Sequence, residues 1–531
     1  MKNKNSVAIL CATFLVVLVS CRKDNLTSNS QDALHPKDKL YSVQEINAVI
    51  QSSLQKTGDF KWNEQSDELL YSAVIHGDSL LSVGYGNPQS SNTVTESNNT
   101  EAQMANISVS AAKRAGVNID GIKSGILQQV KTAEAKQNVL QYESPVLTNM
   151  VVKIGNLSTL QELRKSKAIR YVEPADYNKH LLKSRSAIAT ESLSSGGGGD
   201  PAELPGWFIQ GSGEPLIPKS YGDQKIPDAW KVSTGKGITI GLIDNGVYQA
   251  QTAFTSQEFG AGRTIALFGT FKGNSSSNDG VYANKDDMSA DHGTAMASLI
   301  AAPKKVNLPV GIAYNCNLVS YRSTDFVALW ASKQQQGVST ALTRLADDNN
   351  VKVISMSNGW IFNISALADA VKYAKSKGKL IFAAAGTSIK PINLGFFVID
   401  IPKSVGVIFP ASMSETVAVT GTDYSTTGSL VSCKECHEGD KVYFTTTTAT
   451  SAGINYAVAV YHDTPGQYGF SGSSSAATAI NAGIAALVWS SHPSWNDKQV
   501  LQRMVESAKL YPNKDSKLGY GPINVLKAVQ P

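Results

Sequence analysis

Short apolar runs alternate with helix-like segments over the C-terminal two-thirds of the chain. Residues 236–243 form an apolar run after a glycine, which is typical of a buried strand. Farther on, residues 340–349 and 364–376 have helical character, and strand-like runs over 351–356 and 379–384 follow them. Because strands that alternate with helices pack as a parallel sheet covered on both faces, the sequence predicts an α/β fold of the doubly covered, parallel-sheet class.

Two polar residues stand at the ends of predicted elements. The strand over 236–243 delivers Asp244 at its carboxyl end, where open α/β sheets keep their functional sites. His292 begins a predicted helix over 292–302, and Asp291 is placed to cap the N-terminus of that helix. We therefore expect the imidazole on the first helical turn.

A serine-rich island over 472–477 supplies the third group. Ser474 stands at the start of a predicted Ala-rich helix over 475–489, whose free backbone N–H groups and positive dipole end favour a developing oxyanion. Asp244, His292 and Ser474 are thus an acid, a base and a nucleophile. A hydroxyl attacks a carbonyl poorly at neutral pH, so it needs an imidazole to take its proton and a carboxylate to orient that imidazole.

A different pattern precedes this region. A strand-like run over 146–154, a short helix over 158–165 and a strand over 168–174 predict a small α/β unit. The helical segments of residues 40–145 indicate nothing more specific, and residues 90–100 are typical of a disordered polar loop.

The three islands, in the order Asp, His, Ser, resemble the subtilisin family (subtilases) of serine peptidases over roughly residues 205–531. The flanking segments that carry the same resemblance are 226–230, 353–359, 409–411 and 519–525. The resemblance implies a serine endopeptidase that works through an acyl-enzyme. In it Asp244 orients His292, His292 acts as general base and then acid, and Ser474 is the nucleophile. Substrate backbone would bind along Ser357, Asn358 and Gly359.

The match departs from the family at the oxyanion hole. Where the family has Ala-Ala-Gly-Asn, residues 384–387 read Ala-Ala-Gly-Thr, so the oxyanion would be held by the Ser474 backbone N–H and the Thr387 hydroxyl. Loss of one such donor costs on the order of a hundred- to a thousandfold in rate, which leaves a slow enzyme. The residues at 245, 473, 475 and 478 also differ from the usual ones.

The first residues are typical of an export signal. Lys2 and Lys4 precede an apolar run over 7–19, and residues 18–21, Leu-Val-Ser-Cys, resemble the lipobox of bacterial lipoproteins. The resemblance implies lipidation of Cys21 and a membrane-anchored protein of the bacterial cell envelope, periplasmic or on the cell surface. The alternative is an ordinary secretory signal with a chance cysteine.

The strand over 168–174 resembles the closing strand of the subtilase inhibitor prodomain, which occupies the substrate cleft until it is cleaved. Residues 194–199, Ser-Ser-Gly-Gly-Gly-Gly, are typical of a flexible linker that a protease can cut, so we expect self-processing there. The predicted organisation is a lipoprotein signal peptide (1–20), a tether (21–39), an N-terminal region ending in the prodomain (40–180), a Ser/Gly-rich linker (181–205) and a catalytic domain (206–531) with a β-rich insertion at about 422–470.

Composition fits an exported protein with at least two folding units. The chain has 531 residues, of which 42% are hydrophobic and 43 are glycine, so it can bury a substantial core. The net charge of +5 is small for this length, and the sequence has no basic stripe interleaved with aromatics, which argues against nucleic acid as a partner.

Beyond Cys21 the chain has three cysteines. Cys316 lies near an apolar stretch and is predicted to be buried and free. Residues 433–437 spell Cys-x-x-Cys-His, the haem c attachment pattern, but the surrounding segment lacks the helices that a haem domain needs. We therefore expect a local disulfide between Cys433 and Cys436.

Two other classes of function stay open, a catalytically impaired binding protein of the envelope that uses the subtilase scaffold and a haem-bearing electron carrier. Calcium is common in the family, but no ligand cluster in this sequence is specific enough to assign, so no metal or other cofactor is predicted. The expected partners are protein or peptide substrates, the prodomain as an intramolecular inhibitor, and the membrane through the lipid. Peptidase activity should rise with pH, around pH 6 to 7, as His292 loses its proton.

Overall fold

The computed structural model describes most of the chain, over residues 40–87, 100–181, 215–255, 259–260, 262–273, 279–284, 291–306, 308–388, 403–424, 429–450, 457–460 and 468–531. The predicted signal peptide, Cys21, the tether and the linker lie outside the described residues. So does most of the predicted polar loop, although Thr100 already begins a helix.

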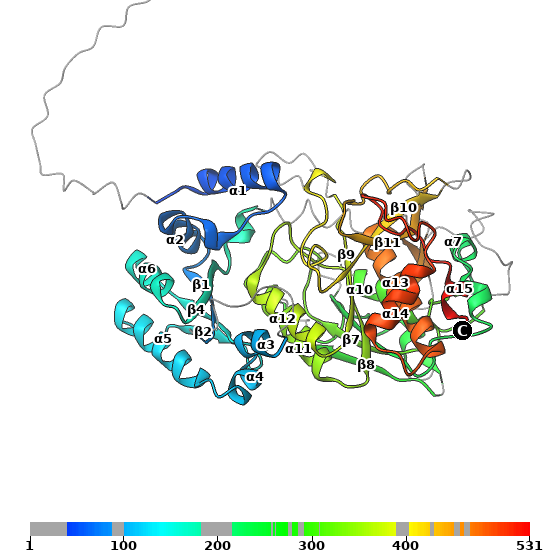
Figure 1. Cartoon of the computed structure of the whole chain (residues 1–531), viewed down its shortest axis with the longest axis horizontal. Coiled ribbons are helices and arrows are strands. Elements are labelled where there is room, and N and C mark those ends of the chain that lie inside the picture. Colours follow the sequence, from blue (N-terminus) through cyan, green and yellow to red (C-terminus); the bar gives the residue numbers. More distant parts are fainter. Residues whose placement is uncertain are drawn as a thin grey trace, which may run out of the picture. The chain divides into compact units, whose positions relative to one another are not determined.

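A seven-stranded sheet forms the centre of the C-terminal region (Figure 1). Its strand order is β11-β10-β9-β8-β5-β7-β6, and every neighbouring pair is parallel, which confirms the predicted fold class. The strands are β5 (Thr239–Asp244), β6 (Ile265–Gly269), β7 (Asn317–Arg322), β8 (Val351–Met356), β9 (Leu380–Ala384), β10 (Val417–Tyr424) and β11 (Val442–Thr450).

Helices cover both faces of this sheet, because successive residues of a strand point to opposite sides. Ile243 of β5 belongs to one buried apolar cluster, together with two helices, and its neighbour Leu242 belongs to a second cluster with two others. The helices of the first cluster are α11 (Ser332–Asp347) and α12 (Ser365–Ser376), and those of the second are α10 (His292–Ala301) and α13 (Ser473–Ser491).

Shorter elements also occur among the described residues of the C-terminal region. They are α7 (Lys219–Asp223), α8 (Ile226–Ala229), α14 (Asp497–Glu506), α15 (Val525–Val529), the 3₁₀ turns Thr252–Phe254 and Lys403–Val405, and an antiparallel pair of strands, β12 (Ala457–Val460) and β13 (Tyr468–Ser471). Strands β11, β12 and the start of β13 lie within the segment 422–470, and β11 extends the central sheet.

The N-terminal region has its own four-stranded antiparallel sheet, in the order β2-β3-β1-β4. Its strands are β1 (Leu80–Tyr85), β2 (Leu140–Glu143), β3 (Asn149–Lys153) and β4 (Ile169–Pro174). Its helices are α1 (Val43–Thr57), α2 (Asp67–His76), α3 (Thr100–Ile107), α4 (Val109–Arg114), α5 (Ile119–Glu134) and α6 (Leu157–Lys165), with 3₁₀ turns at Trp62–Glu64 and Tyr177–Leu181. The inner strand β1 lies where the sequence indicated only helical segments.

Strand β4 contacts helix α12 of the C-terminal region. The guanidinium of Arg170 donates two hydrogen bonds to the Asp369 carboxylate, at 3.1 and 2.6 Å. Glu173 accepts hydrogen bonds from the backbone N–H of Ser365 at 3.0 Å and from its hydroxyl at 2.5 Å. Burial raises the pKa of Glu173 to about 7, although both hydrogen bonds from Ser365 act in the opposite direction. A change in pH near neutrality therefore alters the charge at this contact.

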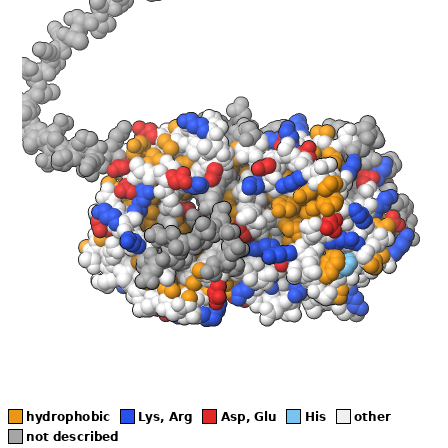
Figure 2. All heavy atoms as spheres, in the orientation of Figure 1, with side chains coloured by type: hydrophobic (Ala, Val, Ile, Leu, Met, Phe, Trp, Pro, Cys, Tyr) orange, Lys and Arg blue, Asp and Glu red, His pale blue; other side chains and the backbone are white. Residues whose placement is uncertain are grey.

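Acidic and basic side chains are interspersed over the face of the molecule shown in Figure 2. Within the described ranges, no helix is both long enough and apolar enough to cross a membrane.

Candidate active site

Asp244 is the last residue of β5, which lies between β7 and β8 inside the sheet. Only 2% of its surface is exposed, and its backbone carbonyl accepts a hydrogen bond from the Ser323 N–H at 2.9 Å. The carboxylate also accepts one from the Asn245 N–H at 2.8 Å. These contacts fix the carboxylate at the carboxyl edge of the sheet, as the sequence predicted.

His292 occupies the first turn of α10 and contacts Asp244 directly. Its Nδ1 lies 2.9 and 3.0 Å from the two carboxylate oxygens, and the ring is 1% exposed. An ionised carboxylate can only accept hydrogen bonds, so Nδ1 carries the hydrogen and Nε2 keeps a lone pair when the ring is neutral. This arrangement leaves Nε2 as the nitrogen that can take up a proton.

The side chain that holds the start of α10 is that of Asn245 and not that of Asp291. Asp291 has helical backbone angles and makes no cap hydrogen bond with its side chain, so the predicted cap is wrong. The backbone N–H of Gly293 instead donates to the amide oxygen of Asn245 at 2.7 Å. A Cβ at position 293 would lie 2.2 Å from the Gly246 carbonyl oxygen, so the close approach of helix and strand end requires glycine.

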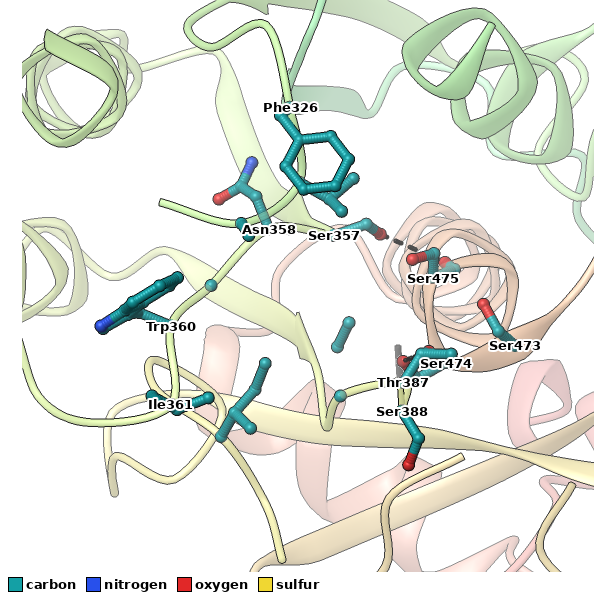
Figure 3. Close-up of a pocket in the computed structure, with 16 residues that line it drawn as sticks. Phe326, Ser357, Asn358, Trp360, Ile361, Thr387, Ser388, Ser473, Ser474 and Ser475 are labelled. Carbon is teal, nitrogen blue, oxygen red and sulfur yellow. Dashed lines mark hydrogen bonds between the residues drawn. The ribbon is translucent and has the colours of Figure 1, made fainter. Parts of the chain in front are cut away.

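Ser474 lies on the first turn of α13, which begins two residues before the predicted start. The preceding residue, Ser473, has a φ of 63°, a left-handed conformation that costs a non-glycine residue roughly 1–2 kcal/mol. The Ser474 hydroxyl shares a hydrogen bond with the hydroxyl of Thr387 at 2.9 Å, and Figure 3 shows the two side chains together. The sequence-predicted nucleophile and oxyanion donor are therefore in contact.

The predicted residues form two pairs. Asp244 is bonded to His292 and Thr387 is bonded to Ser474, but no hydrogen bond between His292 and Ser474 occurs among the described residues. Helices α10 and α13 pack in the same apolar cluster, which brings the two pairs to one region of the sheet.

Thr387 and Ser474 lie in a pocket with no charged side chain among its lining residues (Figure 3). The pocket is lined by 326–328, 357–361, Ala384, 386–388, Ile408 and 473–475. The predicted substrate-binding residues Ser357, Asn358 and Gly359 are part of this lining, which an uncharged group would fill.

The backbone of Gly359 already has partners within the chain. Its N–H donates to the Val327 carbonyl and its carbonyl accepts from the Leu329 N–H, both at 2.9 Å. Pairing of a substrate strand with Gly359 therefore requires this contact to open. No motif in the partner segment indicates this contact.

Asn358 has a structural role that sequence reasoning missed. Its amide donates to the carbonyl of Ile243, next to Asp244, at 2.8 Å. Asn245 and Asn358 thus tie the end of β5 to α10 and to the pocket wall. The sequence marked Asn358 as a substrate-binding residue and Asn245 as a departure from the family, but neither hydrogen bond had a sequence signal.

The cysteines are arranged as predicted. Cys433 and Cys436 form a disulfide, and Cys316 is free and buried. Burial raises the pKa of the Cys316 thiol to about 12, so this thiol stays protonated and unreactive at neutral pH. The disulfide uses both sulfurs that attachment of haem c would need, which speaks against the electron-carrier alternative.

The sequence assigns no calcium site, and the described residues do not assign one either. Within the described ranges, no group of three or more His, Cys, Asp or Glu side chains is placed to hold a metal ion. We therefore assign no metal and derive no chemical step through one.

Comparison with known proteins agrees with the family resemblance of the sequence. Residues 235–521 match the model of the subtilase family. Thermitase of Thermoactinomyces vulgaris is 28% identical over 321 residues, which are 59% of this chain and 96% of thermitase. Subtilisin E of Bacillus subtilis is 29% identical over 242 residues, 45% of this chain and 56% of the relative.

A solved structure has a similar fold. Fervidolysin from Fervidobacterium pennivorans, described as a keratinolytic enzyme related to subtilisin, superimposes with a TM-score of 0.56 and 17% identity. The match covers 85% of this chain and 61% of fervidolysin. The chain thus spans nearly all of thermitase but little more than half of the other two proteins.

Proposed function

This chain belongs to the subtilase family, and from that premise we propose that it is a serine endopeptidase with Asp244, His292 and Ser474 as its triad. The observation that carries the proposal is the buried, doubly hydrogen-bonded contact of Asp244 with His292, on a helix that packs beside the one bearing Ser474.

In the proposed reaction, His292 Nε2 takes the proton of the Ser474 hydroxyl as the oxygen attacks the substrate carbonyl. Asp244 stays ionised and stabilises the imidazolium that forms. The imidazolium then gives its proton to the leaving amine, and water hydrolyses the acyl-enzyme by the same route. Because both Asp244 and His292 are almost fully buried, their interaction is screened little by solvent.

The contact between Thr387 and Ser474 suggests how substrate starts the reaction. When a carbonyl oxygen enters the pocket, it takes the Thr387 hydroxyl as a donor, together with the backbone N–H of Ser474. The Ser474 hydroxyl then loses its partner and turns to His292 Nε2. Catalytic hydrogen bonds that are absent without substrate often form only in the complex.

We further propose that residues 40–181 act as an intramolecular inhibitor of the peptidase. The hydrogen bonds of Arg170 and Glu173 to helix α12 support a stable contact between this region and the C-terminal region. Cleavage in the linker at 194–199 would then separate the peptidase from a lipid anchor at Cys21, unless the two regions stay bound.

One set of proteins tests the triad and the cleavage of the linker. Wild type and Ser474→Ala are expressed, the membrane and soluble fractions are separated, and each is assayed with internally quenched peptides that carry uncharged side chains. We expect peptide cleavage and a linker cut only in the wild type, and Cys21→Ala should release the protein from the membrane. Peptide cleavage that survives in Ser474→Ala would refute the triad, and two uncut full-length proteins would refute self-processing.

A second function, a catalytically impaired binding protein, is favoured by specific contacts. Ser474 is bonded to Thr387 and not to His292, and the backbone of Gly359 is occupied by Val327 and Leu329. If the wild type binds peptides but never cleaves them, and Ser474→Ala binds equally well, this second function is correct.

A further inference from the structure

Residues 431–438 form a short segment that we call the strap. It lies between strand β10 and the residues that follow strand β9. One side of the strap is bonded to β10, where Asp423 N–H donates to Val431 and Cys433 N–H donates to Gly421. The other side runs antiparallel to residues 386–388, which follow β9. The strap is therefore fixed on two sides.

The antiparallel contact places Thr387. Ser388 N–H donates to the Glu435 carbonyl at 2.6 Å, and His437 N–H donates to the Gly386 carbonyl at 2.9 Å. Thr387 lies between these two bonds, opposite Cys436. Among the described residues, the backbone on both sides of Thr387 is therefore hydrogen-bonded to the strap.

The disulfide closes the turn of the strap. Cys433 and Cys436 are 4% and 0% exposed, and the Cys436 N–H donates to the Cys433 carbonyl at 3.0 Å. A Cβ on Gly421 would lie 2.8 Å from the Cys436 sulfur and 3.0 Å from the Ser473 carbonyl oxygen. The sulfur, Gly421 and the residue before Ser474 are therefore packed tightly together.

His437 anchors the far end of the strap. Its Nδ1 is bonded to the Gly406 carbonyl at 2.7 Å, and its own carbonyl accepts from the Thr420 hydroxyl at 2.5 Å. The ring lies so close to Gly386 that a Cβ there would be 2.8 Å from Nδ1. With φ at +121°, Gly386 has a backbone that other residues rarely adopt, so the chain before Thr387 has little freedom.

We propose that the Cys433–Cys436 disulfide and His437 are positioning residues, which hold the Thr387 hydroxyl where it can donate to the oxyanion. The inference rests on the proposed peptidase function. A threonine hydroxyl reaches less far from the backbone than an asparagine amide, so the backbone itself must be held in place. Donors aimed at an oxyanion act only if they are fixed before the charge develops.

A double-mutant cycle tests the inference. The strap is opened by Cys433→Ser with Cys436→Ser, in the wild type and in Thr387→Ala, and kcat and KM are measured on one peptide. Opening the strap in the wild type should lower kcat about 10- to 100-fold, with little change in KM. In Thr387→Ala the same change should alter kcat by no more than about twofold, because the donor is already gone. Cys316→Ala, which removes a remote thiol, is the control.

Equal losses in both backgrounds would overturn the inference, because a general loss of structure does not depend on Thr387. A loss confined to KM, or no loss, would overturn it as well.

If the double serine variant does not fold, the disulfide of the Cys316→Ala protein is reduced with dithiothreitol instead. Dithiothreitol gives two electrons and two protons to the S–S bond and becomes a cyclic disulfide. The kcat should fall on reduction, recover on reoxidation, and change little in the Thr387→Ala background; losses that are the same in both backgrounds contradict the inference here too. A wild type that cleaves no peptide defeats the proposed function and this inference together, whereas an active wild type with additive losses defeats the inference alone.

Discussion

The two halves of the candidate site are built in different ways. Asp244 and His292 are the last residue of a strand and the first of a helix, and their contact is fixed by elements inside the main core. Thr387 lies beyond the end of β9 and is held by the strap, which comes about fifty residues later in the chain.

The elements of the main core fix the geometry of Asp244 and His292, whereas the position of Thr387 can change with the strap. The first half contains the Asp244–His292 contact that the proposed mechanism needs, whereas the proposed oxyanion donor of the second half, Thr387, depends on contacts with the strap. We therefore expect changes in the first half to remove the chemical step and changes in the second to slow it.

The largest effect should come from Ser474→Ala. Without the nucleophile, only binding and oxyanion stabilisation remain, so kcat should fall about 10⁶-fold. Ser490→Ala, near the other end of the same helix, is the matched control and should keep full activity. Peptide hydrolysis followed over hours measures both, and a loss of less than about tenfold in Ser474→Ala would assign the nucleophile elsewhere.

Asp244→Asn should have the next largest effect. An amide in place of the carboxylate favours the wrong imidazole tautomer and no longer stabilises the imidazolium, so kcat should fall about 10⁴-fold with KM almost unchanged. Steady-state kinetics on one peptide measures this. An equally active Asn variant would mean that the buried contact with His292 is only structural.

In the second half, Thr387→Ala should lower kcat about 100- to 1,000-fold, and Thr387→Ser, which keeps a hydroxyl, should retain most of the rate. The pair of variants separates loss of the donor from loss of packing. If Thr387→Ala is as fast as the wild type, Thr387 does not donate to the oxyanion and the contrast between the halves fails.

The smallest effect lies outside both halves, at Glu173. Its pKa is raised from 4.5 to about 7 by burial, so the stability that its neutral form gives to the contact is full below about pH 4.5 and is lost as the pH rises through about 7. The protection of backbone amides in β4 and α12 against hydrogen exchange, corrected for the intrinsic exchange rate, should therefore fall roughly tenfold between about pH 5 and pH 8.

Glu173→Gln should remove most of this pH dependence, because the amide has no proton to lose in that range. Glu162→Gln, at an exposed position of the same region, should keep it. The measurement is made on the full chain carrying Ser474→Ala, so that self-cleavage cannot interfere. Equal pH profiles for all three proteins would show that Glu173 does not titrate at the contact.

The sequence predicted the Asp244–His292 half best, because each of its two elements follows from a continuous run of residues. The apolar run that ends at Asp244 became β5, and the predicted helix at His292 became α10, because each pattern determines its own element. The cap at Asp291 failed because the Asn245 side chain, which comes from the neighbouring strand end, holds the first turn instead. A cap taken from another element leaves no local pattern.

Contacts between distant segments could not be predicted. The sequence indicated a Cys433–Cys436 disulfide but not its place beside Thr387, because strand-like pairing of 386–388 with 435–437 depends on how the whole sheet folds. Strand β1 was missed for a similar reason, since its partners are β3 and β4. The contact of Ser474 with Thr387 is set by side-chain rotamers, which no sequence pattern encodes.

Labelling with a fluorophosphonate, followed by peptide mapping, measures whether His292 activates Ser474 as a nucleophile. One adduct, on Ser474, should form in the wild type, and labelling should be lost in His292→Ala. An unlabelled wild-type Ser474, or equal labelling in His292→Ala, would contradict it.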